Sequence, residues 1–280
     1  MIPLLLMIFH LFSWLCILQS FLFIVIYSII NSYIYASYLL IFILIINYTS
    51  IYFNFIYGSN NFIELHNRNK GGYFKEMNLI KNEDKNEDKT MYCFHPHGIF
   101  SLGFVINGRF NNHFKNTTFL ISSMMFLIPF YGIILRFLKF DKILNNNVKK
   151  YLKNNKNNVY INDRKGFIKY ALRFGYTVVP VYTFGEEKTY KSINLYEKTR
   201  LLLNKLKIPA VFFYGKFLFL PYSDISMTTV IGDKIILPLI KEPKQNDIDK
   251  YHDLYKKKLK ELFDKNKDKY CSSEKNLIFR

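Results

Sequence analysis

The chain begins with a long apolar stretch. Residues 1–63 contain no Asp, Glu, Lys or Arg. A membrane-spanning helix needs about 20 mainly apolar residues, and residues 4–56 supply enough for two, separated by small and polar residues near Asn31. The pattern predicts a transmembrane helical hairpin over residues 1–63. A cleaved signal peptide is the alternative, but this run is too long for a signal core and has no basic start.

The remainder alternates short apolar runs with helical patterns. Residues 91–94 predict a strand, residues from 98 onward predict a helix, and residues 164–174 predict a second helix that ends at Gly175. Residues 178–182 predict another strand. This alternation predicts an α/β domain over residues 91–280.

Two further segments have distinct patterns. Residues 119–140 are nearly continuously apolar but are interrupted by Pro129 and Gly132, which favours a buried or membrane-dipping segment over a third span. After Pro243 a long helix is expected, capped by Asn246 or Asp247. Its apolar face would consist of Ile248, Tyr251, Tyr255, Leu259 and Leu262, and Lys256, Lys257, Lys258 and Lys260 would form a solvated face.

Charge first appears after the apolar stretch. Arg68, Lys70 and Lys75 follow the second expected span, so the positive-inside rule places residues 64–280 in the cytosol. Residues 64–90, with the polar repeat at 81–89, are expected to form a linker. The sequon at Asn116 would then be out of reach of lumenal glycosylation.

The composition adds little about chemistry. A net charge of +18 would draw the domain to anionic lipid head groups, but the charge is scattered and no nucleic-acid module is recognisable, so nucleic acid is not expected as a partner. Heavy use of Lys and Asn is also what an AT-biased coding sequence produces. Three widely spaced cysteines indicate neither a disulfide framework nor a metal site.

The segment Cys93-Phe94-His95-Pro96-His97-Gly98 is the principal candidate for chemistry. In an extended chain Cys93, His95 and His97 would point to one side. Three interpretations are open. The histidines could begin a metal site, although no third ligand is evident; Cys93 could be a nucleophile paired with a histidine; or a neutral imidazole could act as general base for an alcohol attacking a thioester.

Four ordered blocks resemble the type 2 diacylglycerol acyltransferase family, which includes monoacylglycerol and wax-alcohol acyltransferases. The first is the His95-Pro96-His97-Gly98 segment, and the resemblance extends from about residue 91 to residue 270. The other three blocks are Arg164-Lys165-Gly166-Phe167 with the stretch through Gly185-Glu186, Thr228-Thr229-Val230-Ile231-Gly232, and residues 247–265 with Tyr251-His252.

The resemblance implies a glycerolipid-acyltransferase-like domain in endoplasmic-reticulum or lipid-droplet membranes, with several spans and a cytosolic catalytic part. It implies acyl-CoA as co-substrate, a neutral lipid alcohol such as diacylglycerol or monoacylglycerol as acceptor, and neither cofactor nor metal. The implied catalytic residues are His97, favoured as the base, His95 and Glu186. The implied substrate-binding residues are Pro96, Gly98, Arg164, Lys165 and Gly166.

The chain departs from the family pattern at one place. The family normally has a strand ending in Gly-Gly-x-x-Glu roughly twenty residues before Arg-Lys-Gly-Phe. Here no Gly-Gly pair and no Glu occurs between Asp141 and Glu186. Either a coding segment is missing or Asp163 or Glu186 has taken over its acidic role. A catalytically inactive family member that binds lipid or a partner is therefore the alternative function.

Overall fold

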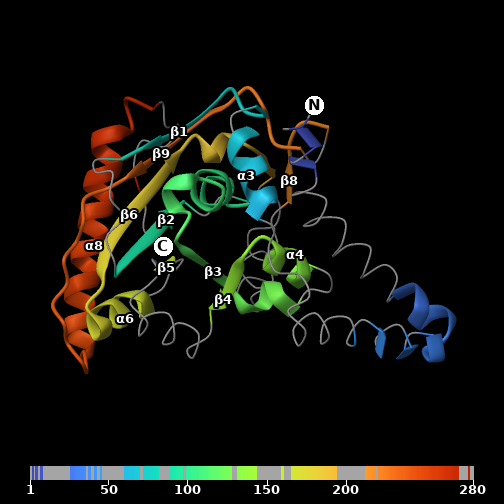
Figure 1. The fold of residues 1–280 in the computed structure, drawn as a ribbon, viewed down its shortest axis with the longest axis horizontal. Coiled ribbons are helices and arrows are strands. Elements are labelled where there is room, and N and C mark those ends of the chain that lie inside the picture. The colour runs from blue at the N-terminus through green and yellow to red at the C-terminus, as the bar shows by residue number, and fades with distance from the viewer. Residues whose placement is uncertain are drawn as a thin grey trace.

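The computed structural model describes residues 60–69, 72–81, 89–96, 99–127, 131–143, 159–160, 165–193, 212–217, 220–270 and 277, with residues 2, 4, 5, 7, 8, 26–35, 37, 38, 41, 42 and 45. Its elements form a mixed α/β architecture (Figure 1), as the sequence predicted. The helices from residue 60 onward are α3 (Asn60–Asn69), η1 (Gly103–Arg109), η2 (Asn112–Phe114), η3 (Ser123–Leu127), α4 (Tyr131–Phe137), α6 (Gly166–Phe174), η4 (Glu186–Lys188) and α8 (Gln245–Asn266). The strands are β1 (Glu76–Ile80), β2 (Thr90–His95), β3 (Thr118–Ser122), β4 (Phe140–Ile143), β5 (Val159–Tyr160), β6 (Thr177–Phe184), β7 (Lys191–Ile193), β8 (Phe212–Tyr214) and β9 (Ser226–Ile231).

A four-stranded sheet in the order β1-β9-β6-β2 lies at the centre. β2 runs parallel to β6, with His95 opposite Tyr182 at the end of the register. β9 is antiparallel to β6 and parallel to β1. Because parallel strands end at the same edge of a sheet, the residues after β2 and β6 come together there.

Each face of this sheet is covered by a different helix. Side chains two apart on a strand point to the same face. On β2 and β6, Cys93 and Tyr182 face the cluster formed with α6 and α8, whereas Phe94 and Val181 face the cluster formed with η1 and α4. In Figure 1, α8 runs along the sheet on one side and η1 is seen nearly end-on on the other.

A second sheet holds β4, β3 and β5 in that order, all parallel. β5 pairs with β3 and also lies beside β2, so it brings the two sheets together. Residues 119–140, predicted to be buried or to dip into a membrane, form β3, η3 and α4 and begin β4. The buried side chains of this stretch are Phe119, Leu120, Phe126, Tyr131, Leu135, Leu138 and Phe140.

The two helices that pack on the sheet follow the predicted periodicity. α6 ends at Gly175, which adopts the left-handed conformation (φ 67°) expected of a residue that terminates a helix. In α8 the buried residues are Ile248, Tyr255, Leu259 and Phe263. The predicted capping residue, Asn246 or Asp247, was wrong, because Lys244 is the N-cap of α8. The Asp247 carboxylate, three residues later, accepts a hydrogen bond from the Lys244 backbone N–H.

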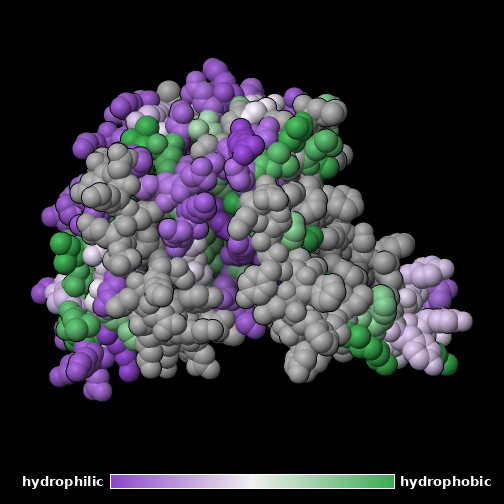
Figure 2. Space-filling view, viewed as in Figure 1, coloured by the Kyte–Doolittle hydropathy of each residue, from purple (hydrophilic) through white to green (hydrophobic). Residues whose placement is uncertain are grey.

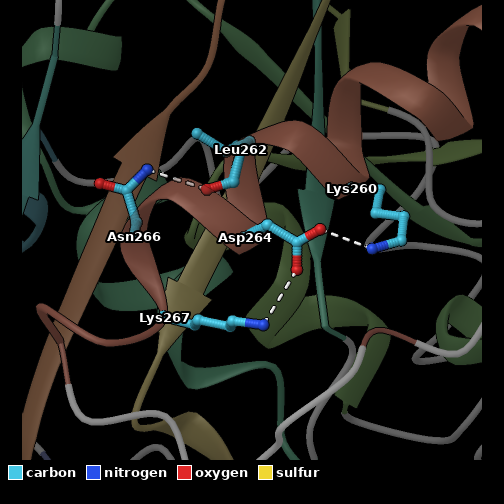
Figure 3. A network of polar contacts seen from close by, with 5 residues as sticks. All are labelled: Lys260, Leu262, Asp264, Asn266 and Lys267. Carbon is cyan, nitrogen blue, oxygen red and sulfur yellow. Dashed lines mark hydrogen bonds and ion pairs between the residues drawn. The ribbon is translucent and has the colours of Figure 1, made fainter.

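The lysines of α8 lie on a solvated face, as predicted. Lys256 and Lys258 pair with Asp253 and Glu261, three residues away on the same helix. Near its end the Asp264 carboxylate accepts from Lys260 and Lys267 (Figure 3). Solvent screens such exposed pairs, so they contribute little to the stability of the fold.

The first 90 residues were predicted to form a transmembrane hairpin and a polar linker. Most of the expected hairpin, residues 1–63, lies outside the described residues, and among those that are described no helix is long and apolar enough to cross a membrane. Residues 64–90 were predicted as a linker. The structure places Glu76–Ile80 in the sheet as β1, because its alternating side chains Met77 and Leu79 pack against apolar residues. Residues 82–88 of the polar repeat are outside the described part.

The described surface is mixed in character. Hydrophilic residues cover much of it and hydrophobic residues form separate small groups (Figure 2). Ile236 and Leu239, in the segment between β9 and α8, are 81% and 63% exposed. Scattered exposed apolar side chains are normal for folded proteins, and by themselves they do not define a binding surface.

Candidate active site

Two of the described candidate residues lie at the neighbouring ends of β2 and β6. His95 is the last residue of β2, Pro96 follows it, and Glu186 begins η4, separated from the end of β6 by Gly185. Lys165 and Gly166 lie at the start of α6. His97, Gly98 and Arg164 lie outside the described residues, so their expected roles remain predictions.

His95 of β2 is held by a side chain of α8. Its Nε2 lies 2.7 Å from the hydroxyl oxygen of Tyr255, which is a hydrogen-bond distance. Tyr255 comes from α8, is 3% exposed, and packs edge-on against Phe167 of α6. The two rings of His95 and Tyr255 are tilted by 48°. Tyr255 was predicted only as part of an apolar helix face, because its polar contact depends on a residue 160 positions away.

Glu186 supports the segment that follows the histidines. Its side chain is buried, and Oε2 accepts a hydrogen bond from the backbone N–H of Gly103 at 3.3 Å. Gly103 is the first residue of η1. The carboxylate therefore connects the end of β6 to the helix that begins shortly after residues 95–98. An acidic residue near the amino end of a helix is electrostatically favourable.

A buried polar network behind Glu186 was not predicted. Thr183 of β6 and Thr229 of β9 share a hydrogen bond of 2.9 Å, and the Asn107 amide of η1 donates to Thr229 Oγ1 and to the Asn78 carbonyl. Gly103 packs directly against Thr183, since a Cβ there would lie 2.3 Å from Thr183 Oγ1. Single polar residues within apolar strands were the only sequence signal. Together they fix η1 on the sheet.

The start of α6 presents positive charge to solvent. Lys165 Nζ lies 2.8 Å from the Asp249 carboxylate of α8, and the Lys165 side chain is 55% exposed. This hydrogen bond raises the pKa of Lys165 and lowers that of Asp249. A Cβ at Gly166 would meet no atom within 4 Å. Lys165 is paired with Asp249 but more than half of its side chain is exposed, which suits recognition of an anionic group from solvent.

His252 lies on α8 between Asp249, which pairs with Lys165, and Tyr255, which contacts His95. Its ring packs edge-on against Phe167, one turn of α8 before Tyr255. Burial lowers the pKa of His252, and the nearby positive charges of Lys256 and Lys165 lower it further. Phe167 thus touches both His252 and Tyr255, so the start of α6 and the His95 ring are connected through packed aromatic side chains.

The structure also bears on the interpretations of residues 93–98 as a cysteine nucleophile or as part of a metal site. The Cys93 thiol is 1% exposed and packs in the cluster with α6 and α8, which favours a packing role over a nucleophilic one. Among the described residues no group of three or more His, Cys, Asp or Glu side chains could hold a metal ion.

The second half of the chain has recognisable relatives. Residues 148–280 match the family model described as diacylglycerol acyltransferase. The resemblance seen in the sequence is confirmed over this range. Human diacylglycerol O-acyltransferase 2 is 39% identical over 137 residues, which cover 44% of this chain and 35% of that protein. Human acyl-CoA wax alcohol acyltransferase 1 is 35% identical over 138 residues, covering 45% of this chain and 42% of that protein.

The relatives are therefore matched over only part of their length. The protein from Danio rerio, also named diacylglycerol O-acyltransferase 2, is 38% identical with 37% of its length covered. Among solved structures, the 1-acyl-sn-glycerophosphate acyltransferase PlsC from Thermotoga maritima aligns with 89% of this chain and 95% of its own, with a TM-score of 0.42 and 14% identity.

Proposed function

We propose that the chain is an acyl-CoA-dependent O-acyltransferase that moves a fatty acyl group onto the hydroxyl of diacylglycerol or monoacylglycerol, in the synthesis of triacylglycerol. The observation that carries the proposal is the pairing of His95 with Tyr255. It joins the histidine segment to α8, which lies within the range that matches the diacylglycerol acyltransferase family. The relatives named acyltransferases support the reaction class.

In the proposed reaction a histidine of the His95-Pro96-His97 segment takes the proton from the acceptor hydroxyl as its oxygen attacks the thioester carbonyl. The C–O bond forms, the C–S bond breaks, and the proton passes to the departing CoA thiolate. An unperturbed imidazole has a pKa near 6.5 and suits this exchange at neutral pH. We favour His97 as the base, because the Nε2 of His95 is already bonded to Tyr255.

The other residues would bind and orient the substrates. Lys165, with Arg164 beside it in sequence, would contact the phosphates of acyl-CoA, and the exposed position of Lys165 supports this role. Pro96, Gly98 and Gly166 would shape the backbone around the substrates. The Glu186 carboxylate would hold the start of η1, which follows His97 a few residues later in the chain. No step in this scheme requires a cofactor or a metal.

The location of the protein is part of the proposal. The charge-free apolar stretch of residues 1–63 would anchor it in the endoplasmic-reticulum membrane, or on lipid droplets, with residues 64–280 facing the cytosol. The acceptor lipid would reach the site from the bilayer, and acyl-CoA from the aqueous side.

The test is an acyl-transfer assay on membranes that contain the full chain, with labelled oleoyl-CoA and either diacylglycerol or monoacylglycerol as acceptor. Loss of a general base should lower the rate about 10²–10⁴-fold in His97→Ala, with the amount of membrane-bound protein unchanged. His95→Ala should be less severe if His97 is the base. Product formation unaffected by both changes would eliminate the mechanism.

One sequence feature favours a second candidate function, an inactive member that binds lipid or a partner. No Gly-Gly pair and no Glu occurs between Asp141 and Glu186, where the family pattern has both. In this case the wild-type membranes would form no ester with any lipid alcohol. A transfer rate that His97→Ala abolishes would exclude this candidate.

A further inference from the structure

Tyr255 is a buried residue with a polar atom in an apolar cluster. Its ring packs against Phe167 with the ring centres 5.0 Å apart, and the residue is 3% exposed. Its hydroxyl oxygen lies 2.7 Å from His95 Nε2. A buried hydroxyl without a hydrogen-bond partner bears the full cost of its desolvation, so the bonded arrangement is strongly preferred over an open one. The hydroxyl therefore restrains the imidazole ring.

The bond tolerates both forms of the histidine. A tyrosine hydroxyl can donate to an Nε2 that carries no proton and can accept from an Nε2 that carries one. The contact can therefore persist while the site gains and loses a proton. What it fixes is the plane of the His95 ring, and with it the start of the segment Pro96-His97-Gly98 that follows directly in the chain.

The same helix also contacts the start of α6. Asp249 of α8 pairs with Lys165, and Tyr255 follows six residues later. At a rise of 1.5 Å per residue these two contacts lie roughly 9 Å apart along the helix axis. α8 thus sets the distance between Lys165, the expected acyl-CoA contact, and the histidine segment. The Tyr255 hydroxyl is the group through which α8 contacts His95.

We propose that Tyr255 is a positioning residue: its hydroxyl holds the His95 imidazole at the end of β2 in the orientation that acyl transfer requires. This proposal rests on the proposed function. A structural role for the aromatic ring alone would predict that only the packing of Tyr255 matters. The hydroxyl and the ring must therefore be separated by experiment.

Tyr255→Phe removes the hydroxyl and keeps the ring. Tyr251→Phe is the matched control, because Tyr251 is a half-buried tyrosine on the same helix, one turn away. In membranes with the full chain, we expect kcat of Tyr255→Phe to fall about tenfold or more, since small errors in the placement of catalytic groups are costly. KM for oleoyl-CoA should change by less than about twofold, because the Lys165 end of the site is untouched.

A second measurement does not depend on activity. Diethyl pyrocarbonate modifies the ring nitrogens of neutral histidines, and peptide mass spectrometry reports the rate at each position. In Tyr255→Phe the rate at His95 should rise severalfold, because Nε2 is no longer bonded to the hydroxyl. His113, which lies in η2 and away from α8, serves as the internal reference and should be unchanged.

The outcomes separate the two proposals. A lower kcat with preserved KM and faster modification of His95 would support the role of Tyr255. Equal behaviour of Tyr255→Phe and Tyr251→Phe in both measurements would overturn it. If the wild-type chain transfers no acyl group, the proposed function fails instead, and the modification rates still decide whether the hydroxyl restrains His95.

Discussion

At the scale of single residues, the site depends on positions whose importance comes from neighbours distant in sequence. Gly103 and Thr183 are 80 positions apart, yet an added Cβ on the glycine would overlap the threonine side chain. Gly103 also donates its N–H to Glu186. This single position therefore joins the packing of η1 to the buried Glu186 carboxylate.

We expect Gly103→Ala to destabilise the fold by about 1–3 kcal/mol, because the new methyl group would lie 2.3 Å from Thr183 Oγ1 and the helix must shift. Gly166→Ala is the matched control, since its Cβ would meet nothing within 4 Å. Thermal unfolding of the purified chain in detergent measures both. Equal unfolding temperatures for the two variants would contradict the close approach of η1 to β6.

His252 should make stability depend on pH. Its pKa in the folded state lies below the ordinary value of 6.5 because burial and nearby lysines disfavour the charged form. The folded state is therefore favoured when His252 is neutral. Its contribution is complete above about pH 6.5 and is lost as the pH falls through the lower folded pKa.

The measurement is the free energy of unfolding of the wild type and of His252→Gln between about pH 7.5 and pH 5. The glutamine variant should lose less stability over this interval, because it has no proton to bind. His113→Gln, which changes a histidine outside the α6–α8 contact, is the control. A wild-type profile that His252→Gln leaves unchanged would show that this ring is not desolvated.

At the scale of elements, α8 does most to organise the site. Its inner face covers the sheet, and its contacts reach Lys165 at one point and His95 at another. Its outer face carries paired charges, including the Asp264 network in Figure 3. The helix is therefore held by burial and not by its ion pairs, which are exposed.

If burial holds α8 in place, replacing leucine by alanine should have unequal effects on stability at a buried and at an exposed position of the helix. Leu259→Ala should cost about 2–5 kcal/mol, because Leu259 is buried among the strands and aromatic rings. Leu254→Ala, at a position that is 37% exposed, should cost less than about 1 kcal/mol. Denaturant unfolding distinguishes them, and similar costs would mean that α8 is not packed as described.

At the scale of the whole molecule, segments from both halves of the chain complete one sheet. β1 pairs with β9, and β2 pairs with β6, so the order along the chain differs from the order across the sheet. The segment that matches the diacylglycerol acyltransferase family, residues 148–280, contributes β6, β9 and α8, whereas His95 comes from β2. The candidate site therefore exists only in the assembled fold.

The orientation proposed for the whole molecule can be tested at Asn116. This residue is exposed and begins an Asn-Thr-Thr sequon, so a lumenal domain would carry sugar there. We expect none, because residues 64–280 are proposed to face the cytosol. Full-length chain made in the presence of microsomes should migrate identically with and without endoglycosidase. A shift that Asn116→Gln abolishes would reverse the orientation.

Sequence alone was sufficient for features that depend on local spacing. The period of apolar residues predicted α6, β6 and the buried face of α8, and left-handed Gly175 ended α6 where expected. The His95-Pro96-His97-Gly98 segment and the acyltransferase blocks were recognisable because they are short and contiguous. β1 was missed because five alternating residues beside a polar repeat carry little signal.

Tertiary structure alone decided which distant residues meet. Tyr255 was assigned to an apolar face, but only folding places its hydroxyl beside His95. Gly103, Asn107, Thr183 and Thr229 gave no motif, because a buried hydrogen-bond network is defined by three-dimensional proximity and not by spacing. The sequence thus determined the elements and the candidate chemistry, and the packing of η1 and α8 on opposite faces of one sheet determined how His95 and Glu186 are held.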